Sequence, residues 1–141
     1  MNPCRDCVET YVHFFENLNL QSLDRIDVLF SDTATFKDPF NAVQGRQAIR
    51  RVFEHMFRTT VSPRFQVRDW MCSGQSACVR WRFTCTLKGR GIDVSGMTHL
   101  SFDHDGRVNA HVDYWDAAGG LYERLPLIGM LMRWLRERLA A

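Results

Sequence analysis

Two short segments of the sequence place an aspartate among aromatic side chains. In FKDPF, Asp38 follows a strand-like stretch and precedes a proline. In HVDYWD, Asp113 lies two residues from both His111 and Trp115. A carboxylate that faces a pocket can accept a proton or orient water, whereas one in a turn can cap backbone N–H groups. Asp38 and Asp113 are therefore candidate bases, and a turn acid is the alternative for Asp38.

A polar row on a neighbouring strand-like segment could supply a positive partner for these acids. The row consists of Arg80, Arg82 and Thr84. The opposite row is apolar and consists of Val79, Trp81, Phe83, Cys85 and Leu87. If the polar row lines an enclosed cavity, unpaired charge is unfavourable there, so we expect Arg82 to pair with Asp113 beside His111. Alternatively, the polar rows face water and the apolar rows form the core, in which case any such pair is only structural. Periodicity alone leaves both arrangements open.

The elements that must position these residues are helical in the first third of the chain. Apolar residues at helical spacing predict helices over 5–18, from Ser22 to Phe30 and after Gly45. Between the second and third helices, TATFKDP has the pattern of a short strand that Pro39 ends. The order favours an α+β layer fold.

The remainder of the chain alternates with a period of two. The predicted strands are 64–72, 77–88, 92–103 and 107–116, with glycine-containing turns at KGRG and DHDGR. The tail predicts a final apolar helix that closes one end of the fold or packs on a second subunit. Its basic, amphipathic character also fits a membrane surface, which is the less favoured interpretation.

Composition narrows the function classes. A chain of 141 residues with a net charge of +2 fits one domain, 1–141, without the basic stripe of a nucleic-acid-binding protein. No apolar run is long enough to span a membrane. The five cysteines, without a signal peptide, favour a reducing, cytoplasmic location. The lone Cys4–Cys7 motif and the scattered histidines lack the spacing of metal ligands, so we expect no metal and no cofactor.

Several segments, in order, resemble the nuclear transport factor 2-like superfamily. LNLQSLDRIDVLFSDTATFKDPF and GRQAIRRVF resemble ketosteroid isomerases, HVDYWD resembles limonene-epoxide hydrolases, and DGRVNAHVDYWDAAGGLYERLP resembles SnoaL-like bacterial proteins. The resemblance implies a cone-shaped α+β fold: a curved antiparallel or mixed sheet, three N-terminal helices over a pocket and a C-terminal helix. It also implies that Arg80, Arg82 and Thr84 point into the cone with His111, Asp113 and Trp115. The apolar face would then form a homodimer.

The resemblance to ketosteroid isomerases assigns possible chemistry, although the set of residues is incomplete. Asp38 matches the base, but the positions of the two oxyanion donors hold Phe14 and Thr98. Without those donors, the stabilisation of a developing oxyanion is lost, so steroid-type isomerisation is not expected.

The other two comparisons within the superfamily also rest on aspartates. Against the epoxide hydrolases, Asp113 and Arg82 match, while Thr84 replaces the second acid. SnoaL-type cyclases need a single aspartate base, which Asp113 or Asp38 could supply.

These observations predict a pocket for a small apolar or carbonyl-containing organic molecule. The expected catalytic residues are Asp113, Arg82 and Asp38. The expected pocket residues are Phe14, Phe40, Arg80, Thr84, Thr98, His111 and Trp115. The activity would be that of a cofactor-independent isomerase, lyase, cyclase or hydrolase. The alternatives are a non-catalytic binding protein for an apolar metabolite and a structural dimerisation module.

Overall fold

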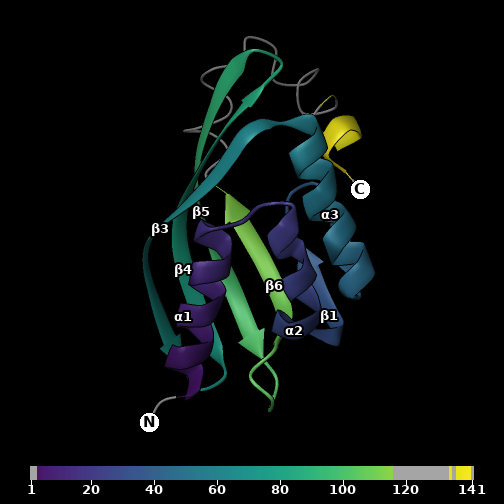
Figure 1. Cartoon of the computed structure of the whole chain (residues 1–141). Helices are drawn as coiled ribbons and strands as arrows, with labels where there is room; N and C mark the ends of the chain where they lie inside the picture. The colour runs from purple at the N-terminus through teal and green to yellow at the C-terminus, as the bar shows by residue number, and fades with distance from the viewer. Residues whose placement is uncertain (1–2, 116–133, 135, 141) are drawn as a thin grey trace.

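The computed structural model describes residues 3–115, 134 and 136–140 (Figure 1). The helices are α1 (Pro3–Glu16), the 3-10 helix η1 (Gln21–Arg25), α2 (Ile26–Leu29) and α3 (Arg46–Thr59). The strands are β1 (Phe30–Lys37), β2 (Ala42–Gln44), β3 (Val61–Ser73), β4 (Ser76–Leu87), β5 (Arg90–Phe102) and β6 (Val108–Trp115). The predicted α+β class is confirmed, and the period-two segments are strands β3 to β6.

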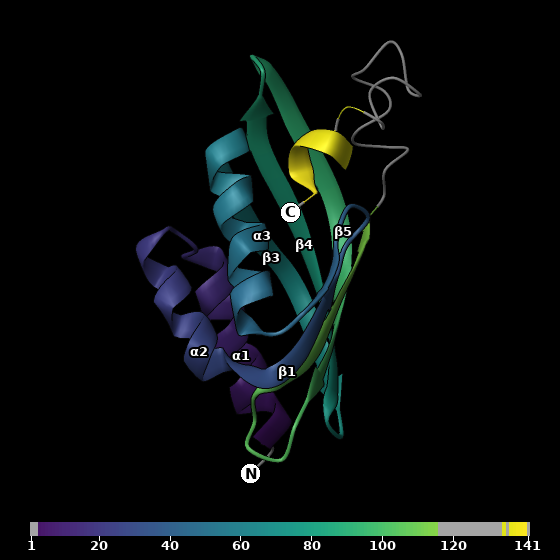
Figure 2. The ribbon, with the colours of Figure 1, turned by 90° about the vertical axis from the view of Figure 1, so that its right-hand side faces the viewer.

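The strands form one curled sheet, and the helices lie on one side of it (Figure 2). The strand order in this six-stranded sheet is β2-β1-β6-β5-β4-β3. β1 runs parallel to β6, while every other neighbouring pair is antiparallel. The sheet is therefore mixed, as the resemblance implied. The short strand β2 was not predicted, because its three residues are too few for a recognisable alternation.

The register of the strands decides which side chains face the helices. Trp81 of β4 is opposite Gly96 of β5, and Gly96 is opposite Trp115 of β6. Residues that are directly paired across strands point to the same face of a sheet. The apolar row of β4 therefore shares the inner face with Asp113 and Trp115.

The expectation that the polar row of β4 points into the cone is wrong. Arg80 forms an ion pair with Asp69 of β3, and Arg82 forms one with Asp93 of β5, on the outer face of the sheet. Thr84 lies on the same outer face, opposite Asp93. Outside, these arginines keep contact with water and need no buried partner.

The apolar row of β4 is likewise not a subunit interface. Trp81 and Phe83 are 5% and 7% exposed within the single chain, since the helices cover this face. The predicted homodimer stays a prediction. The outer face that would form it carries the exposed side chains of Met71, Met97 and Tyr114 among charged residues.

The core lies between the inner face of the sheet and the helices. Its fully buried side chains include Phe14 of α1, Ile26 of α2, Phe30 of β1, Ile49 of α3 and Leu100 of β5. No helix in the described part of the chain is long and apolar enough to cross a membrane.

The tail of the chain is described only in part. Trp134 and residues 136–139 are helical and lie near the end of α3 (Figures 1 and 2). The predicted entry of this helix through a glycine pair, and its interruption by Pro126, lie outside the described residues.

Gly96 provides the space in which the Trp81 ring lies. A Cβ atom at this position would lie 2.5 Å from the Trp81 ring and 2.8 Å from the backbone oxygen of Tyr114. Backbone oxygens cannot retreat without breaking the β5–β6 pairing. The absence of a side chain at residue 96 is therefore a requirement of the inner face.

We expect Gly96→Ala to lower the free energy of unfolding by about 1–3 kcal/mol, because the added methyl group overpacks against Trp81. Chemical denaturation followed by circular dichroism measures this change. Ser95→Ala, at the neighbouring exposed position, is the matched control. Equal stability of the two variants would show that Trp81 does not lie against Gly96.

Candidate functional site

A cavity of about 80 Å³ lies between α3 and the inner face of the sheet. Its apolar wall includes Phe15, Phe36, Phe53, Phe65, Trp81 and Phe83. Its polar groups in the described part of the chain are Asp38, Asn41, Thr60 and Asp113. Two carboxylates thus face a cavity that is otherwise largely aromatic.

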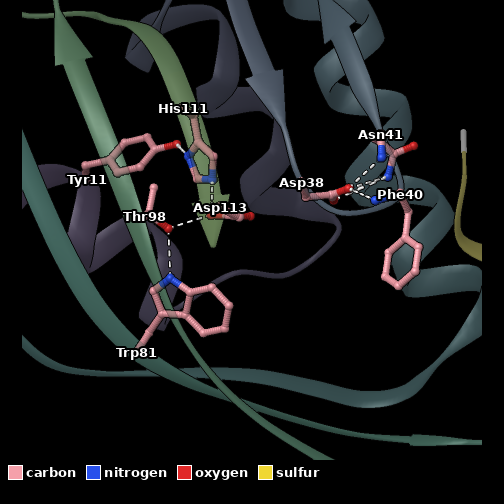
Figure 3. A network of polar contacts seen from close by, with 8 residues as sticks. All are labelled: Tyr11, Asp38, Phe40, Asn41, Trp81, Thr98, His111 and Asp113. Atoms are coloured by element: carbon pink, nitrogen blue, oxygen red, sulfur yellow. Dashed lines mark hydrogen bonds and ion pairs between the residues drawn. The ribbon is translucent and has the colours of Figure 1, made fainter. Parts of the chain in front are cut away.

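A chain of hydrogen bonds holds Asp113 at the cavity wall (Figure 3). The Trp81 indole Nε1–H donates to Thr98 Oγ1 over 2.7 Å, and the Thr98 hydroxyl donates to Asp113 Oδ1 over 2.6 Å. His111 Nε2 lies 2.7 Å from the same Oδ1, and His111 Nδ1 lies 2.7 Å from the Tyr11 hydroxyl. Oδ1 of Asp113 therefore contacts two side chains, Thr98 and His111, and each of these is hydrogen-bonded to a further aromatic residue.

The chemistry of these groups fixes most of the donor directions. An indole N–H only donates, so Thr98 accepts from Trp81 and has its hydrogen left for Asp113. Burial raises the pKa of Tyr11 well above its usual value, and the negative charge of Asp113 raises it further. Tyr11 therefore keeps its proton, and its hydroxyl can donate a hydrogen bond to Nδ1 of His111 in the tautomer whose Nε2–H faces Asp113. Oδ2 of Asp113 accepts no hydrogen bond from the residues that the structure describes.

Asp38 is both a turn acid and a residue of the cavity wall. Its Oδ1 accepts hydrogen bonds from the backbone N–H groups of Phe40 and Asn41, which makes it a turn acid, and its carboxylate also lines the cavity. Burial raises the pKa of Asp38 above its ordinary value, the hydrogen bonds from Phe40 and Asn41 oppose this shift, and the negative charge of Asp113 adds to it. The two acids therefore sense each other across the cavity.

Five of the seven predicted pocket residues, all except Arg80 and Thr84, fall into three groups. Phe40 and Trp115 line the cavity, as expected. Thr98 and His111 contact Asp113 from behind and lie outside the lining of the main cavity. Phe14 is buried in the core against other aromatic rings and does not belong to the cavity lining.

The predicted pair between Arg82 and Asp113 is wrong, as is the placement of Arg80 and Thr84 in the pocket. The guanidinium group of Arg82 forms two hydrogen bonds with Asp93, of 2.8 and 2.5 Å. The partner that we expected to be an arginine is instead the buried His111, only 2% exposed.

Two residues of this hydrogen-bond network were not identified as site residues from the sequence. Tyr11 lies in the predicted helix 5–18, and Trp81 was assigned only to the apolar strand row. Tyr11 and His111 are 100 positions apart, so no spacing in the sequence signals their contact. A tyrosine hydroxyl on a predicted buried face was the available hint, because such groups usually find a partner.

A second, smaller cavity of about 20 Å³ lies on the other side of Trp81. Tyr11, Thr98 and Asp113 contribute its polar groups. A space of this size can hold one water molecule. Asp113 therefore borders two spaces: the main cavity and a position fit for a single water.

The C-terminal helical segment borders the main cavity, in agreement with its predicted closing position. Leu139 lines the cavity, and the Asn41 side-chain amide donates to the Leu139 backbone oxygen over 3.3 Å. His55 of α3 contacts the backbone oxygen of Arg138. Lys88 lies 4.3 Å from the centre of the Trp134 ring, a cation–π contact.

The described residues contain no cluster of side chains that could bind a metal ion. Within 3–115, 134 and 136–140, no group of three or more histidine, cysteine, aspartate or glutamate residues could hold a metal ion. The polar groups at the cavity are a carboxylate pair with an amide and a hydroxyl. These groups suit acid–base chemistry or ligand binding.

We expect Tyr11→Phe to lower the free energy of unfolding by about 1–3 kcal/mol, because it leaves the buried Nδ1 of His111 without a partner. Urea denaturation measures this loss. Tyr114→Phe removes the same hydroxyl from a side chain that is 62% exposed, and it should change the stability by less than about 0.5 kcal/mol. Equal effects of the two variants would contradict the Tyr11–His111 contact.

Asp38 makes the stability depend on pH in a defined direction. Because its pKa is higher in the folded chain than the ordinary value of 3.8, its contribution is fully present below pH 3.8 and is lost as the pH rises through the folded pKa. Asp38→Asn retains an oxygen for the turn and cannot titrate. The free energy of unfolding of Asp38→Asn, relative to that of the wild type, should therefore rise as the pH increases from 3.8.

Denaturation at several pH values measures this difference in the free energy of unfolding, and the exposed Asp27→Asn is the control. A gain that shrinks with increasing pH would mean that the Asp38 pKa is lowered.

Known structures with the same arrangement are numerous but distant in sequence. A protein assigned as a SnoaL-like polyketide cyclase from Jannaschia sp. CCS1 is 18% identical, with 79% of this chain and 86% of that chain covered and a TM-score of 0.69. An LEH-like epoxide hydrolase from M. tuberculosis is 14% identical, with 93% and 96% covered and a TM-score of 0.70.

A third similar structure is a protein with a ketosteroid isomerase-like fold from Catenulispora acidiphila DSM 44928, in complex with trimethylamine. It is 16% identical, with 84% of this chain and 91% of that chain covered and a TM-score of 0.70. None of the curated proteins matches the sequence significantly. At these identities the likeness establishes the fold and leaves the activity open.

The sequence itself also matches a family. Residues 11–111, which include α1 from Tyr11 onward and β6 up to His111, match the SnoaL-like domain. The chain therefore belongs to the SnoaL-like domain family and has the nuclear transport factor 2-like fold.

Proposed function

We propose that this protein binds a small, largely apolar organic molecule in the main cavity and that Asp113 acts on it as a base. The reaction would be an isomerisation, cyclisation or hydrolysis without a cofactor. The observation that carries this proposal is the Asp113 carboxylate, which borders an aromatic cavity while Thr98 and His111 hold one of its oxygens.

The hydrogen bonds around Asp113 leave a defined part of the carboxylate for chemistry. Oδ1 is engaged by Thr98 and His111, and Oδ2 is the oxygen available to take a proton from a substrate carbon or from water. A fixed carboxylate in an apolar environment loses little orientation freedom when it reacts. His111 would stabilise the carboxylate in the role that the sequence assigned to Arg82.

Asp38 is suited to a different step from Asp113. Burial raises the pKa of Asp38, which favours its protonated form more than in water. Two carboxyl groups in different environments can divide the work of a base and an acid. With a neutral substrate in the cavity, Asp38 in its protonated form would return a proton after Asp113 has removed one; beside a positive group its ionised form is favoured instead.

Binding without turnover is the second candidate, and the hydrogen-bond directions favour it in one respect. The Thr98 hydroxyl gives its hydrogen to Asp113, so it cannot donate to a substrate oxygen. Phe14 has no hydroxyl and lies in the core. Among the described residues, neither of the expected oxyanion donors is therefore available, and stabilisation of an enolate would be weak.

The decisive experiment compares Asp113→Asn with the wild type on a panel of small ketones, lactones and epoxides. Quenching of tryptophan fluorescence detects binding, because Trp81 and Trp115 line the cavity. Proton NMR in D₂O detects deuterium uptake, isomerisation and hydrolysis in one spectrum. We expect the variant to bind the same compounds and to lose about 10²- to 10⁴-fold in rate.

Asp105→Asn, in an exposed turn, is the matched control and should react like the wild type. If the wild type binds compounds of the panel but converts none of them, the protein is a binding protein. If Asp113→Asn retains full activity, another group is the base.

A further inference from the structure

We propose that the ligand of the main cavity carries a small organic cation, namely a quaternary ammonium or a protonated tertiary amine. This inference rests on the proposed binding role of the cavity and names the class of ligand. It depends on three features of the described residues: an aromatic corner, the charges that face the cavity, and the size of the enclosed space.

The aromatic corner consists of Phe40, Trp81 and Trp115. The rings of Phe40 and Trp115 are 5.3 Å apart at an angle of 79°, and those of Trp81 and Trp115 are 6.4 Å apart at 87°. All three line the main cavity. The three rings therefore form adjoining, nearly perpendicular parts of the cavity wall, and aromatic ring faces attract alkylammonium groups.

Hydrogen bonds connect each of the two carboxylates to a residue of the aromatic corner, directly or through one side chain. The backbone N–H of Phe40 donates to Asp38 Oδ1 over 2.8 Å, and Trp81 connects to Asp113 through the Thr98 hydroxyl. Asp113 and Trp115 are also alternate residues of β6 on the inner face. Figure 3 shows Phe40 beside Asp38, and Trp81 connected to Asp113 through Thr98; both carboxylates and both rings line the same cavity.

Among the described residues, the charged groups that line the cavity are both negative. No lysine or arginine belongs to the lining within the described residues. Arg80 and Arg82 of the neighbouring strand are directed to the outer face, where they pair with other acids. Two carboxylates in a largely apolar space without a counter-charge are unfavourable, and a bound cation would remove this cost. An anionic ligand would increase it.

The size of the cavity fits the head group of such a ligand. A cavity of 150 Å³ admits benzene, so by proportion a space of about 80 Å³ accommodates ~3 heavy atoms. The compact head group of a quaternary ammonium, one nitrogen with its methyl groups, is close to this size and has no N–H group that needs a directed partner. The remainder of a larger ligand would extend toward Leu139 and the C-terminal segment.

The cation also gives the two acids separate tasks. Asp38, held by the turn, would lie beside the positive group of the ligand. Asp113 would keep the contacts with His111 and Thr98 and act on the rest of the molecule. The charge of the ligand therefore determines its orientation, and turnover is not required for binding.

Three probes of nearly the same shape test the charge directly. Choline is a quaternary ammonium, 3,3-dimethylbutan-1-ol is its neutral carbon analogue, and 3,3-dimethylbutanoate is an anion of similar size. Isothermal titration calorimetry of the wild-type protein at neutral pH measures the affinities. We expect choline to bind about tenfold more tightly than the alcohol, and the carboxylate not to bind.

Variants separate charge from shape. We expect Asp38→Asn to reduce the choline affinity about tenfold and to leave the affinity for the alcohol unchanged, while the exposed Asp27→Asn changes neither. Choline affinity should also fall as the pH is lowered and Asp38 takes up its proton, and this decrease should be smaller in Asp38→Asn. Circular dichroism of each variant verifies that it is folded.

Equal affinities for choline and the alcohol, no choline binding at millimolar concentration, or an unchanged choline affinity in Asp38→Asn would each overturn the inference. These results would not decide the proposed function, because the panel of ketones, lactones and epoxides is neutral. Conversely, choline binding together with full activity of Asp113→Asn on the neutral panel would leave the cation site in place and overturn the base role of Asp113.

Discussion

One oxygen atom, Oδ1 of Asp113, connects the parts of this fold that make the cavity. It receives the Thr98 hydroxyl from β5 and faces His111 Nε2 from the same strand, β6. Behind them, Trp81 of β4 and Tyr11 of α1 complete the network. Buried polar groups are costly unless they are paired, so this network fixes the strand register and the position of α1 together. Loss of one partner leaves the others unsatisfied.

The same network explains why the inner face can be both apolar and charged. The hydrogen bonds that hold Asp113 come from side chains whose remaining surface is aromatic or buried. Asp38 is stabilised differently, by backbone N–H groups of its own turn. The cavity therefore contains two acids with separate supports. Burial raises the pKa of Asp38 and the negative charge of Asp113 adds to this shift, which is the physical reason for expecting a positive or proton-transferring ligand between the two acids.

Most of the fold, but only part of the site, could be predicted from the sequence. Helical and period-two spacing placed α1, α3 and β3 to β6, because these elements bury one face. The same pattern could not give the register between strands, so Arg82 was turned inward by analogy, although Trp81 faces the cavity. Asp38 and Asp113 were identified from their aromatic neighbours. Tyr11 was not, since its contact with His111 exists only after the sheet and α1 have packed.

The protonation of His111 tests the central claim most directly. Heteronuclear NMR that correlates the ring nitrogens with the carbon-bound hydrogens of each histidine distinguishes the two tautomers. The account predicts that His111 carries a hydrogen on Nε2, which faces Asp113, and that Nδ1 accepts a hydrogen bond from Tyr11. It also predicts that this state persists in the absence of ligand. A hydrogen on Nδ1 with a bare Nε2 would contradict the account, because His111 could not then donate to Asp113.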